Sequence, residues 1–199
     1  MSGAPPDARS TSAPSPKRVL LVPGLWNSGP DHWQSYWEKG RNDCLRVVQR
    51  DWETPRAAEW IATLERAVLD AIGPVVLAAH SLGCTLVARF AARAAEATRA
   101  WVRGALLVAP SDVEAPSYPK GTEGFAPMPL ERLPFPSIVV ASSNDEYVSL
   151  ERARLFARSW GGRFVEAGAH GHVNSASQLG MWPLGQGLLD QLLGGPVRP

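Results

Sequence analysis

The chain has little of what marks several large classes of protein. Its 199 residues include two cysteines, Cys44 and Cys84, too few for a disulfide framework or a cysteine-based metal cluster, so we expect both to be reduced structural thiols. The net charge is +1, which favours neither nucleic acid nor an anionic membrane surface. No apolar run approaches the ~20 residues of a membrane span, and no secretory signal is evident. We therefore expect a cytoplasmic protein that binds neither nucleic acid nor membrane.

The composition is otherwise that of an ordinary globular chain. With 45% hydrophobic residues it can bury a sizeable core, and its length fits one domain. Residues 1–16 are rich in proline, serine and alanine and have almost no large apolar side chain, so burial cannot offset the entropy cost of ordering them. We predict a disordered tail over residues 1–16 and a single domain over residues 17–195.

From Lys17 onward, short apolar runs alternate with longer segments of helical period. This pattern predicts an α/β protein with a mostly parallel sheet flanked by helices. The runs are almost continuously apolar, as expected of strands that are covered on both faces. The six strands are expected at residues 18–22, 45–49, 75–79, 102–108, 137–141 and 163–166.

Two helices have clear start signals. Asp31 and Gln34 resemble a capping box, which predicts a helix there with His32 at its surface. A second helix is expected to begin near Pro55 and to carry Ile72 on its apolar face before a glycine stops it. Both helices are expected to pack against the sheet.

Residues 110–134 interrupt this alternation. The segment contains six prolines and two glycines and has no sustained period. Long irregular connections are uncommon in compact domains and often form lids or binding loops. A surface crossover and a short lid are equal alternatives, and the segment is too short to form a separate cap domain.

The most informative local signal is Ser81, which ends an apolar run and precedes a segment of helical character. In a nucleophile elbow the strand-to-helix turn strains the serine backbone, so small residues are needed two positions before and after it. Ala79 and Gly83 occupy these positions, giving AxSxG in place of GxSxG. The alanine adds one methyl group to the turn. We therefore expect Ser81 to be a nucleophile.

A serine nucleophile needs an imidazole base, and the imidazole needs an acid that orients it. Asp145 lies a few residues beyond the strand expected at 137–141 and is our candidate for the acid. Asp112, which follows the strand expected at 102–108, is the alternative, although it could equally cap a turn.

The base is expected in the loop that follows the last predicted strand. This loop contains His170 and His172, and we favour His172 because Gly171 leaves its backbone free to approach Ser81. His170 is the alternative. The two histidines lack the carboxylates or thiolates of a catalytic metal site, so we expect neither a metal nor an organic cofactor. His80 is expected to have a structural role.

The oxyanion of a tetrahedral intermediate requires preorganised donors. The backbone amide of Leu82, directly after the nucleophile, is one candidate. The backbone amide of Leu25, in the glycine-containing loop after the first strand, is the other. Trp26 and Asn27 in the same loop are expected to line the substrate pocket.

These motifs together resemble the serine-hydrolase family typified by retinoblastoma-binding protein 9 and the bacterial YdeN-like proteins. The resemblance covers residues 18–193 and rests on VPG at 22–24, GPDHWQ at 29–34, HSLG at 80–83, SNDEYV at 143–148 and GHVN at 171–174. It implies a compact α/β-hydrolase fold without a large cap domain. It also implies a catalytic triad of Ser81, Asp145 and His172.

The combined hypothesis is a serine hydrolase that cleaves a small ester, thioester or amide through an acyl-enzyme on Ser81. A non-catalytic binding or scaffold protein with the same fold is the alternative. A different reaction on the same triad, such as perhydrolysis, is a third possibility because fold does not determine function. The sequence indicates neither the individual substrate nor the oligomeric state.

Overall fold

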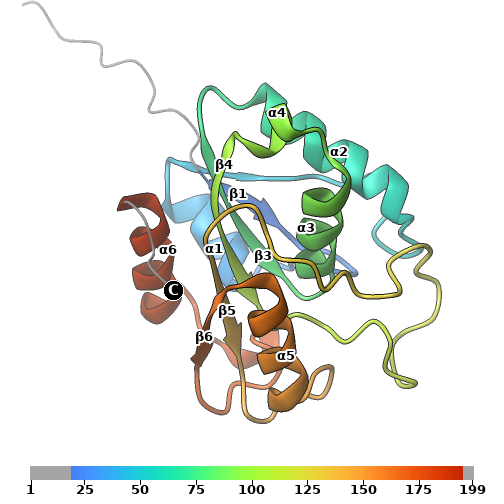
Figure 1. Ribbon diagram of the computed structural model, residues 1–199. Coiled ribbons are helices and arrows are strands. Elements are labelled where there is room, and N and C mark those ends of the chain that lie inside the picture. The colour runs from blue at the N-terminus through green and yellow to red at the C-terminus, as the bar shows by residue number, and fades with distance from the viewer. Residues whose placement is uncertain (1–18, 195–199) are drawn as a thin grey trace, which may run out of the picture.

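Six parallel strands form one sheet at the centre of the protein (Figure 1). The structure is a computed structural model that describes residues 19–194, so the tail predicted at residues 1–16 lies outside the described part. Along the sheet the order is β2-β1-β3-β4-β5-β6, and every neighbouring pair is parallel. The strands are β1 (Val19–Val22), β2 (Cys44–Arg46), β3 (Val75–His80), β4 (Val102–Val108), β5 (Ser137–Ala141) and β6 (Arg163–Glu166). The predicted α/β class and parallel sheet are confirmed.

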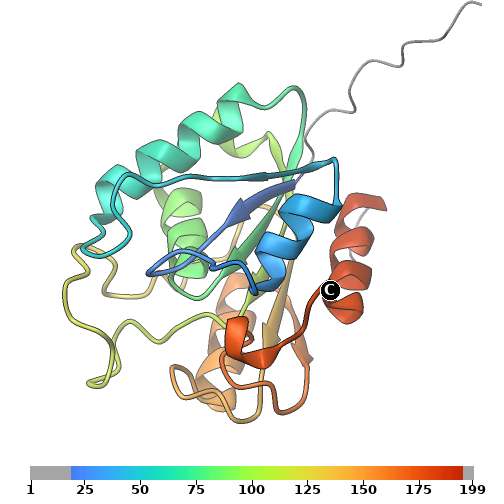
Figure 2. The same cartoon turned by 180° about the vertical axis from the view of Figure 1, so that it is seen from behind.

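Helices cover both faces of this sheet, as Figures 1 and 2 show from opposite sides. One face is covered by α1 (Trp33–Gly40) and α6 (Pro183–Gly194). The other face is covered by α2 (Ala57–Asp70), α3 (Leu82–Arg93) and α5 (Leu150–Trp160), with the short α4 (Glu96–Arg99) at the end of α3. No large cap domain is built onto the part of the chain spanning residues 19–194.

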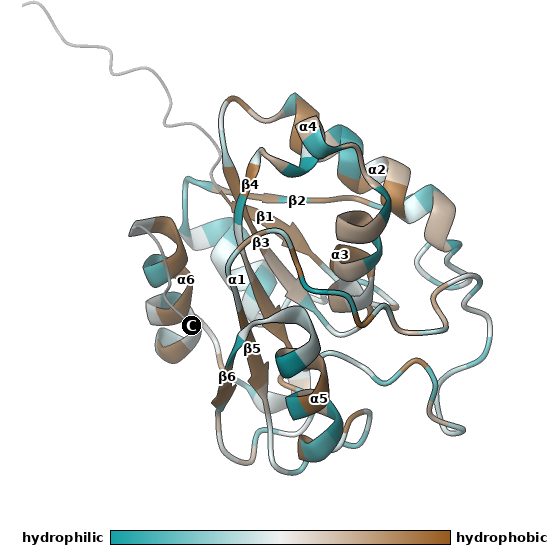
Figure 3. Cartoon of the chain, in the orientation of Figure 1, coloured by the Kyte–Doolittle hydropathy of each residue, from teal (hydrophilic) through white to brown (hydrophobic). Residues whose placement is uncertain are grey.

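Alternate residues of each central strand enter two separate cores. In β1, Leu20 and Val22 pack with α2 and α3, whereas Val19 and Leu21 pack with α1 and α6. All four side chains are fully buried. Figure 3 accordingly shows the central strands coloured as hydrophobic along their length. The continuous apolar runs in the sequence are therefore explained by burial on both faces.

The predicted boundaries differ most from the structure at the ends of β2 and α2. Strand β2 ends at Arg46 rather than at residue 49, because β2 is an edge strand whose only neighbour, β1, ends at Val22. The Val47 amide makes one further bond to the Leu21 carbonyl, and the chain then leaves the sheet. Helix α2 ends at Asp70, so Ile72 is not on its apolar face and is 85% exposed.

The proline-rich segment 110–134 is packed against the α2 and α3 side of the sheet. Phe125 and Met128 are buried in that core. The Arg89 guanidinium of α3 is itself buried and donates hydrogen bonds to the carbonyls of Phe125 and Pro127. The second half of the segment is therefore a crossover that is held in place by core packing. Its function as a lid stays a prediction.

Candidate active site

Ser81 lies in the sharp turn between β3 and α3. Its φ is 56° and its ψ is −124°, a region that residues with a side chain seldom adopt. Two glycines allow this turn to pack closely against the loop after β1. A Cβ on Gly24 would lie 2.7 Å from the Ser81 Cβ, and a Cβ on Gly83 would lie 2.3 Å from the Val22 carbonyl oxygen. The Ala79 methyl group fits in the core, where the residue is fully buried.

A continuous chain of hydrogen bonds leads from Ser81 to a buried carboxylate. The His172 Nε2 atom lies 2.8 Å from the Ser81 Oγ. The His172 Nδ1 atom lies 2.9 Å from each Asp145 oxygen, and the Asp145 side chain has no exposed surface. The Tyr147 amide also donates to Asp145, at 2.8 Å. Because a carboxylate only accepts, Nδ1 carries the proton and Nε2 is free to accept the serine hydroxyl.

The carboxyl ends of three parallel strands bring these residues together. Ser81 follows β3, Asp145 follows β5, and His172 lies in the loop after β6. The last two loops are also joined directly. The Ser142 hydroxyl accepts the His170 amide at 2.8 Å, and the Asn144 side-chain oxygen accepts the Gly171 amide at 2.7 Å. The loop carrying the imidazole is therefore held against the loop carrying the carboxylate.

The alternative acid lies in a different interaction. Asp112 forms an ion pair with Arg152 of α5, with N–O distances of 2.9 and 3.2 Å. Arg152 also contacts Glu114. Of the two candidate acids, Asp145 is the one that contacts an imidazole, and of the two candidate bases, His172 is the one that contacts Ser81.

His32 is not at the surface, so that prediction is wrong. Its residue surface is 3% exposed because its ring packs against the His80 ring, with centroids 4.6 Å apart. His32, not Asp31, is also the N-cap of α1, since its Nδ1 atom accepts the Gln34 amide. The GPDHWQ motif at 29–34 does signal the start of a helix, but its capping-box spacing favours Asp31 over His32.

Three imidazole rings, of His32, His80 and His172, pack against one another in edge-on and tilted arrangements. The His80 ring lies between His32 and His172, 4.9 Å from the latter. The His80 Nε2–H donates to the His172 carbonyl oxygen at 2.8 Å, as a structural role predicts. Burial lowers the pKa of His80 well below its ordinary value and, with Arg46 and His172 nearby, lowers the pKa of His32 to about 3. Both neighbours of His172 are therefore neutral near pH 7.

A cavity of about 350 Å³ opens above the serine hydroxyl. Its walls come from the loop after β1, the proline-rich segment, and the loops that follow β5 and β6. Trp26 and Asn27, the predicted pocket residues, are both part of the wall. The remaining wall residues include Leu25, Ser111, Tyr118, Pro119, Tyr147 and residues 174–176. The lining is largely apolar and aromatic.

The loop after β1 has an unusual backbone that is fixed by an arginine. Trp26 and Asn27 both have a positive φ, at 63° and 64°. Arg46 of β2 donates to the Asn27 side chain and to the Ser28 carbonyl, at 2.7 and 2.9 Å. The Trp26 and Asn27 amides are bound by backbone carbonyls, whereas the Leu25 amide has no acceptor within residues 19–194. The Leu25 amide is therefore available to a ligand.

A second candidate donor lies on the other side of Ser81. Leu82 is the first residue of α3, and the first amides of a helix have no acceptor within the helix. No bond to the Leu82 amide is present among the described residues. The oxyanion role that the sequence predicts for the Leu25 and Leu82 amides stays a prediction.

Two features are absent from residues 19–194. No group of three or more histidine, cysteine, aspartate or glutamate side chains is arranged to hold a metal ion. None of the helices in this range has the length and apolar character needed to cross a membrane. Cys44 and Cys84 are both buried and unpaired, in agreement with the prediction of structural thiols.

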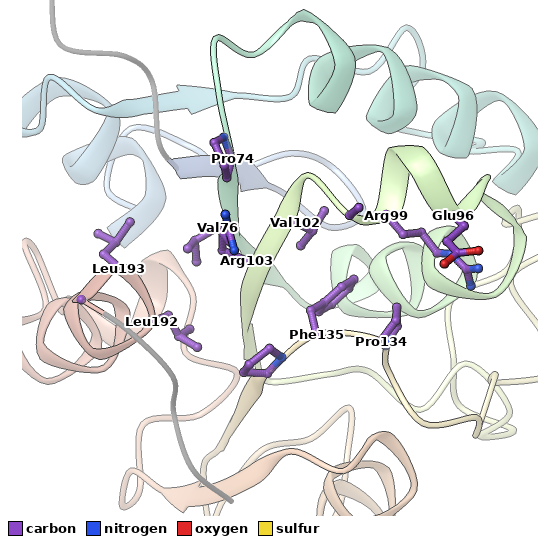
Figure 4. A pocket seen from close by; sticks show the side chains of 13 residues that line it. Pro74, Val76, Glu96, Arg99, Val102, Arg103, Pro134, Phe135, Leu192 and Leu193 are labelled. Carbon is purple, nitrogen blue, oxygen red and sulfur yellow. The ribbon is translucent and has the colours of Figure 1, made fainter.

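A larger hollow lies at the opposite, amino-terminal edge of the sheet (Figure 4). Its volume is about 880 Å³. It extends between the end of α6, with Leu192 and Leu193, and the α4 region, with Glu96 and Arg99 (Figure 4). We refer to it below as the amino-edge groove.

The parallel sheet, the strained serine after β3 and the Ser–His–Asp hydrogen bonds define an α/β-hydrolase fold. Residues 19–191 match the family model described as serine hydrolase, and the chain belongs to this family. A search of curated proteins found no match.

Solved structures share this fold. A putative YdeN-like hydrolase from Pectobacterium atrosepticum is 28% identical, with a TM-score of 0.76 over 88% of this chain and 89% of the other. The ydeN gene product of Bacillus subtilis is 20% identical, with a TM-score of 0.73 over 90% and 100%. The carboxylesterase CesB of Bacillus subtilis is 16% identical, with a TM-score of 0.63 over 92% and 86%.

Proposed function

We propose that the protein hydrolyses a small ester, thioester or amide through an acyl-enzyme on Ser81. His172 acts as the base and then as the acid, and Asp145 orients it. The observation that supports this proposal is the hydrogen-bonded chain from the buried Asp145 carboxylate through His172 to Ser81, whose hydroxyl lines the 350 Å³ cavity. Membership of the serine hydrolase family supports the same reaction class.

The proposed reaction has two halves. As the Ser81 Oγ forms a bond to the substrate carbonyl carbon, its proton passes to the His172 Nε2. The tetrahedral intermediate collapses when His172 returns this proton to the leaving group and the bond to that group breaks. Water then attacks the acyl-enzyme, gives a proton to His172, and releases the acid when the Ser81 Oγ takes the proton back. No external oxidant, reductant or cofactor takes part in these steps.

The Leu25 and Leu82 amides are the proposed donors to the oxyanion. They lie in the loop after β1 and at the start of α3, which Gly24 and Gly83 allow to come into close contact. Preorganised amides stabilise the charge that develops in the transition state without reorganisation during the reaction. Their contribution comes from the backbone, so substitution of either leucine side chain is a weak test.

The cavity favours a small substrate. Its volume of about 350 Å³ is near the lower end of the range for small-molecule sites, about 300–1,000 Å³. Trp26, Tyr118 and Tyr147 provide aromatic surface within it. A short acyl or aryl ester fits this volume and lining better than a long-chain lipid. The fold shared with a structure named as a carboxylesterase makes esters the first class to test.

The experiment that tests this proposal combines labelling with hydrolysis. A fluorophosphonate is expected to modify the wild-type chain at Ser81, and Ser81→Ala is expected to lower the turnover of a short aryl ester on the order of a millionfold. Ser143→Ala, which removes an exposed serine near the same edge, serves as the control. Undiminished hydrolysis by Ser81→Ala would refute the assignment.

A non-catalytic binding protein is the second candidate, because a triad can be retained while the pocket binds a ligand without turnover. It predicts no covalent adduct on Ser81 even at high probe concentration. A short aryl ester would then bind, if at all, without release of product. The labelling experiment therefore discriminates between the two candidates.

A further inference from the structure

We propose that Ser111 is an additional catalytic residue whose hydroxyl donates a hydrogen bond to the nucleophilic oxygen of Ser81. This inference rests on the proposed function. It is based on a contact outside the predicted triad: the Oγ atoms of Ser81 and Ser111 lie 2.7 Å apart. Ser111 is 1% exposed and is part of the cavity wall.

The backbone around Ser111 is fixed on both sides. Ala109, at the end of β4, has a φ of 47°, and its amide is bound by the Val140 carbonyl at 2.8 Å. The Asp112 amide is bound by the Tyr147 carbonyl at 3.1 Å, while the Asp112 carboxylate pairs with Arg152. The turn after β4 therefore presents the Ser111 hydroxyl to Ser81 from a rigid position. This ion pair gives Asp112 a structural role in place of the catalytic one weighed from the sequence.

The hydrogen-bond pattern determines the direction of the contact. Asp145 accepts the proton on the His172 Nδ1, so the His172 Nε2 has a lone pair and accepts the Ser81 hydroxyl. The Ser81 proton is thus used in the bond to His172. The remaining bond at the Ser81 oxygen must come from the Ser111 hydroxyl, with Ser81 as the acceptor.

This donor contributes when Ser81 loses its proton. The deprotonated oxygen has three lone pairs: one attacks the carbonyl carbon, one faces the protonated imidazole, and one accepts Ser111. The Ser111 bond can therefore persist through the attack. Hydrogen bonds to a charged oxygen are stronger than those to a neutral one, so the contact stabilises the transition state more than the resting enzyme. The same bond forms again when the Ser81 oxygen leaves the acyl group.

The test is the second-order rate of Ser81 modification by a fluorophosphonate. In this reaction the Ser81 oxygen forms a bond to phosphorus, fluoride leaves, and the serine proton passes to His172. We expect Ser111→Ala to lower this rate by about ten- to a hundredfold, the effect of losing one hydrogen bond to a charged group. The kcat for a short aryl ester is expected to fall by a similar factor with KM little changed.

Two variants provide the controls. Ser137→Ala removes another buried serine hydroxyl, which is 3% exposed and has no hydrogen-bond partner within residues 19–194, and is expected to label at the wild-type rate. Ser111→Thr keeps the hydroxyl and is expected to label faster than Ser111→Ala. Thermal unfolding of each variant shows whether the fold is intact, since a purely structural role would lower the Tm while leaving the labelling rate of the folded protein unchanged.

The outcomes separate this inference from the proposed function. Equal labelling rates for wild type and Ser111→Ala, or a rise in KM at constant kcat, would overturn the role of Ser111 alone. If Ser111→Thr is labelled no faster than Ser111→Ala, the hydroxyl at position 111 does not contribute to the reactivity of Ser81, and the inference is likewise overturned. A wild-type chain that no fluorophosphonate labels would overturn the proposed function, and the role of Ser111 with it.

Discussion

The two hollows at opposite edges of the sheet differ in chemistry more than in size. The amino-edge groove has about 880 Å³, and the cavity above Ser81 has about 350 Å³. The larger one is lined by proline, aliphatic and exposed charged side chains. The smaller one is lined by the Ser81 hydroxyl and the His172 imidazole, and this imidazole is hydrogen-bonded in turn to the buried Asp145 carboxylate. The larger volume therefore does not identify the functional site, whereas the chemistry of the lining does.

Strand direction explains the difference. In a parallel sheet the carboxyl ends of all strands meet at one edge, and the loops that leave them converge. Ser81, Asp145 and His172 follow three such ends, whereas the groove is formed where strands begin. The predictions below test whether function is confined to the carboxyl edge.

After the loss of the nucleophile itself, the largest effect on turnover is expected from substitution of the acid. Asp145→Asn preserves the shape of the side chain but removes the charge that fixes the His172 tautomer, so kcat is expected to fall by about 10⁴-fold. Asp112→Asn, which breaks the pair with Arg152 that helps to fix the Ser111 turn, is expected to lower kcat by no more than Ser111→Ala does, far less than Asp145→Asn. Steady-state hydrolysis of a short aryl ester measures both. The reverse ranking would show that the assignment of the acid is wrong.

A smaller loss of reaction rate is expected when a methyl group is added next to the turn at Ser81. Gly24→Ala would place a methyl group 2.7 Å from the Ser81 Cβ, so the turn or the loop must shift. A displacement of about 1 Å at a reacting group can cost about 10²-fold in rate. We expect slower fluorophosphonate labelling of a folded protein. Gly187→Ala, at a site with open space, is the control, and similar rates for both variants would contradict the steric argument.

The buried His32 is expected to make stability depend on pH. Burial lowers the pKa of His32 from 6.5 to about 3, so between these values the unfolded chain binds a proton that the folded chain does not. The free energy of unfolding therefore decreases as the pH falls below 6.5, by up to about 1.4 kcal/mol per pH unit.

His32→Asn removes this titration while keeping a side-chain acceptor for the start of α1. Urea unfolding between pH 6.5 and 4 is expected to give a shallower slope for the variant than for wild type. Carboxylates titrate in both proteins and cancel in the difference. Parallel slopes would mean that His32 does not stay neutral in the folded protein.

The smallest effect is expected from the amino-edge groove. Arg103 is exposed and lines the groove, so Arg103→Ala is expected to change the free energy of unfolding by no more than about 0.5 kcal/mol. Its kcat and KM for the aryl ester are expected to equal those of wild type. A clear change in either constant would show that the two edges of the sheet are coupled.

Many of the strands and the turn at Ser81 were predictable because local sequence patterns determine them. The strand from Val102 to Val108 and the one from Ser137 to Ala141 were predicted to the residue, since strands buried on both faces have nearly continuous apolar sequences. The turn at Ser81 was predictable for a similar reason. Close packing against the end of β1 and the loop after it leaves no room for a side chain at position 83. The glycine required there is visible in the sequence.

Tertiary structure alone decided which groups contact one another. Asp112 and Asp145 both follow strands, and nothing in their flanking residues shows that Arg152 pairs with one while an imidazole contacts the other. The burial of His32 and the contact between Ser81 and Ser111 depend on separate loops that meet at one edge of the sheet. A linear pattern encodes the periodicity of each element, whereas distances between residues remote in sequence arise only when the elements pack.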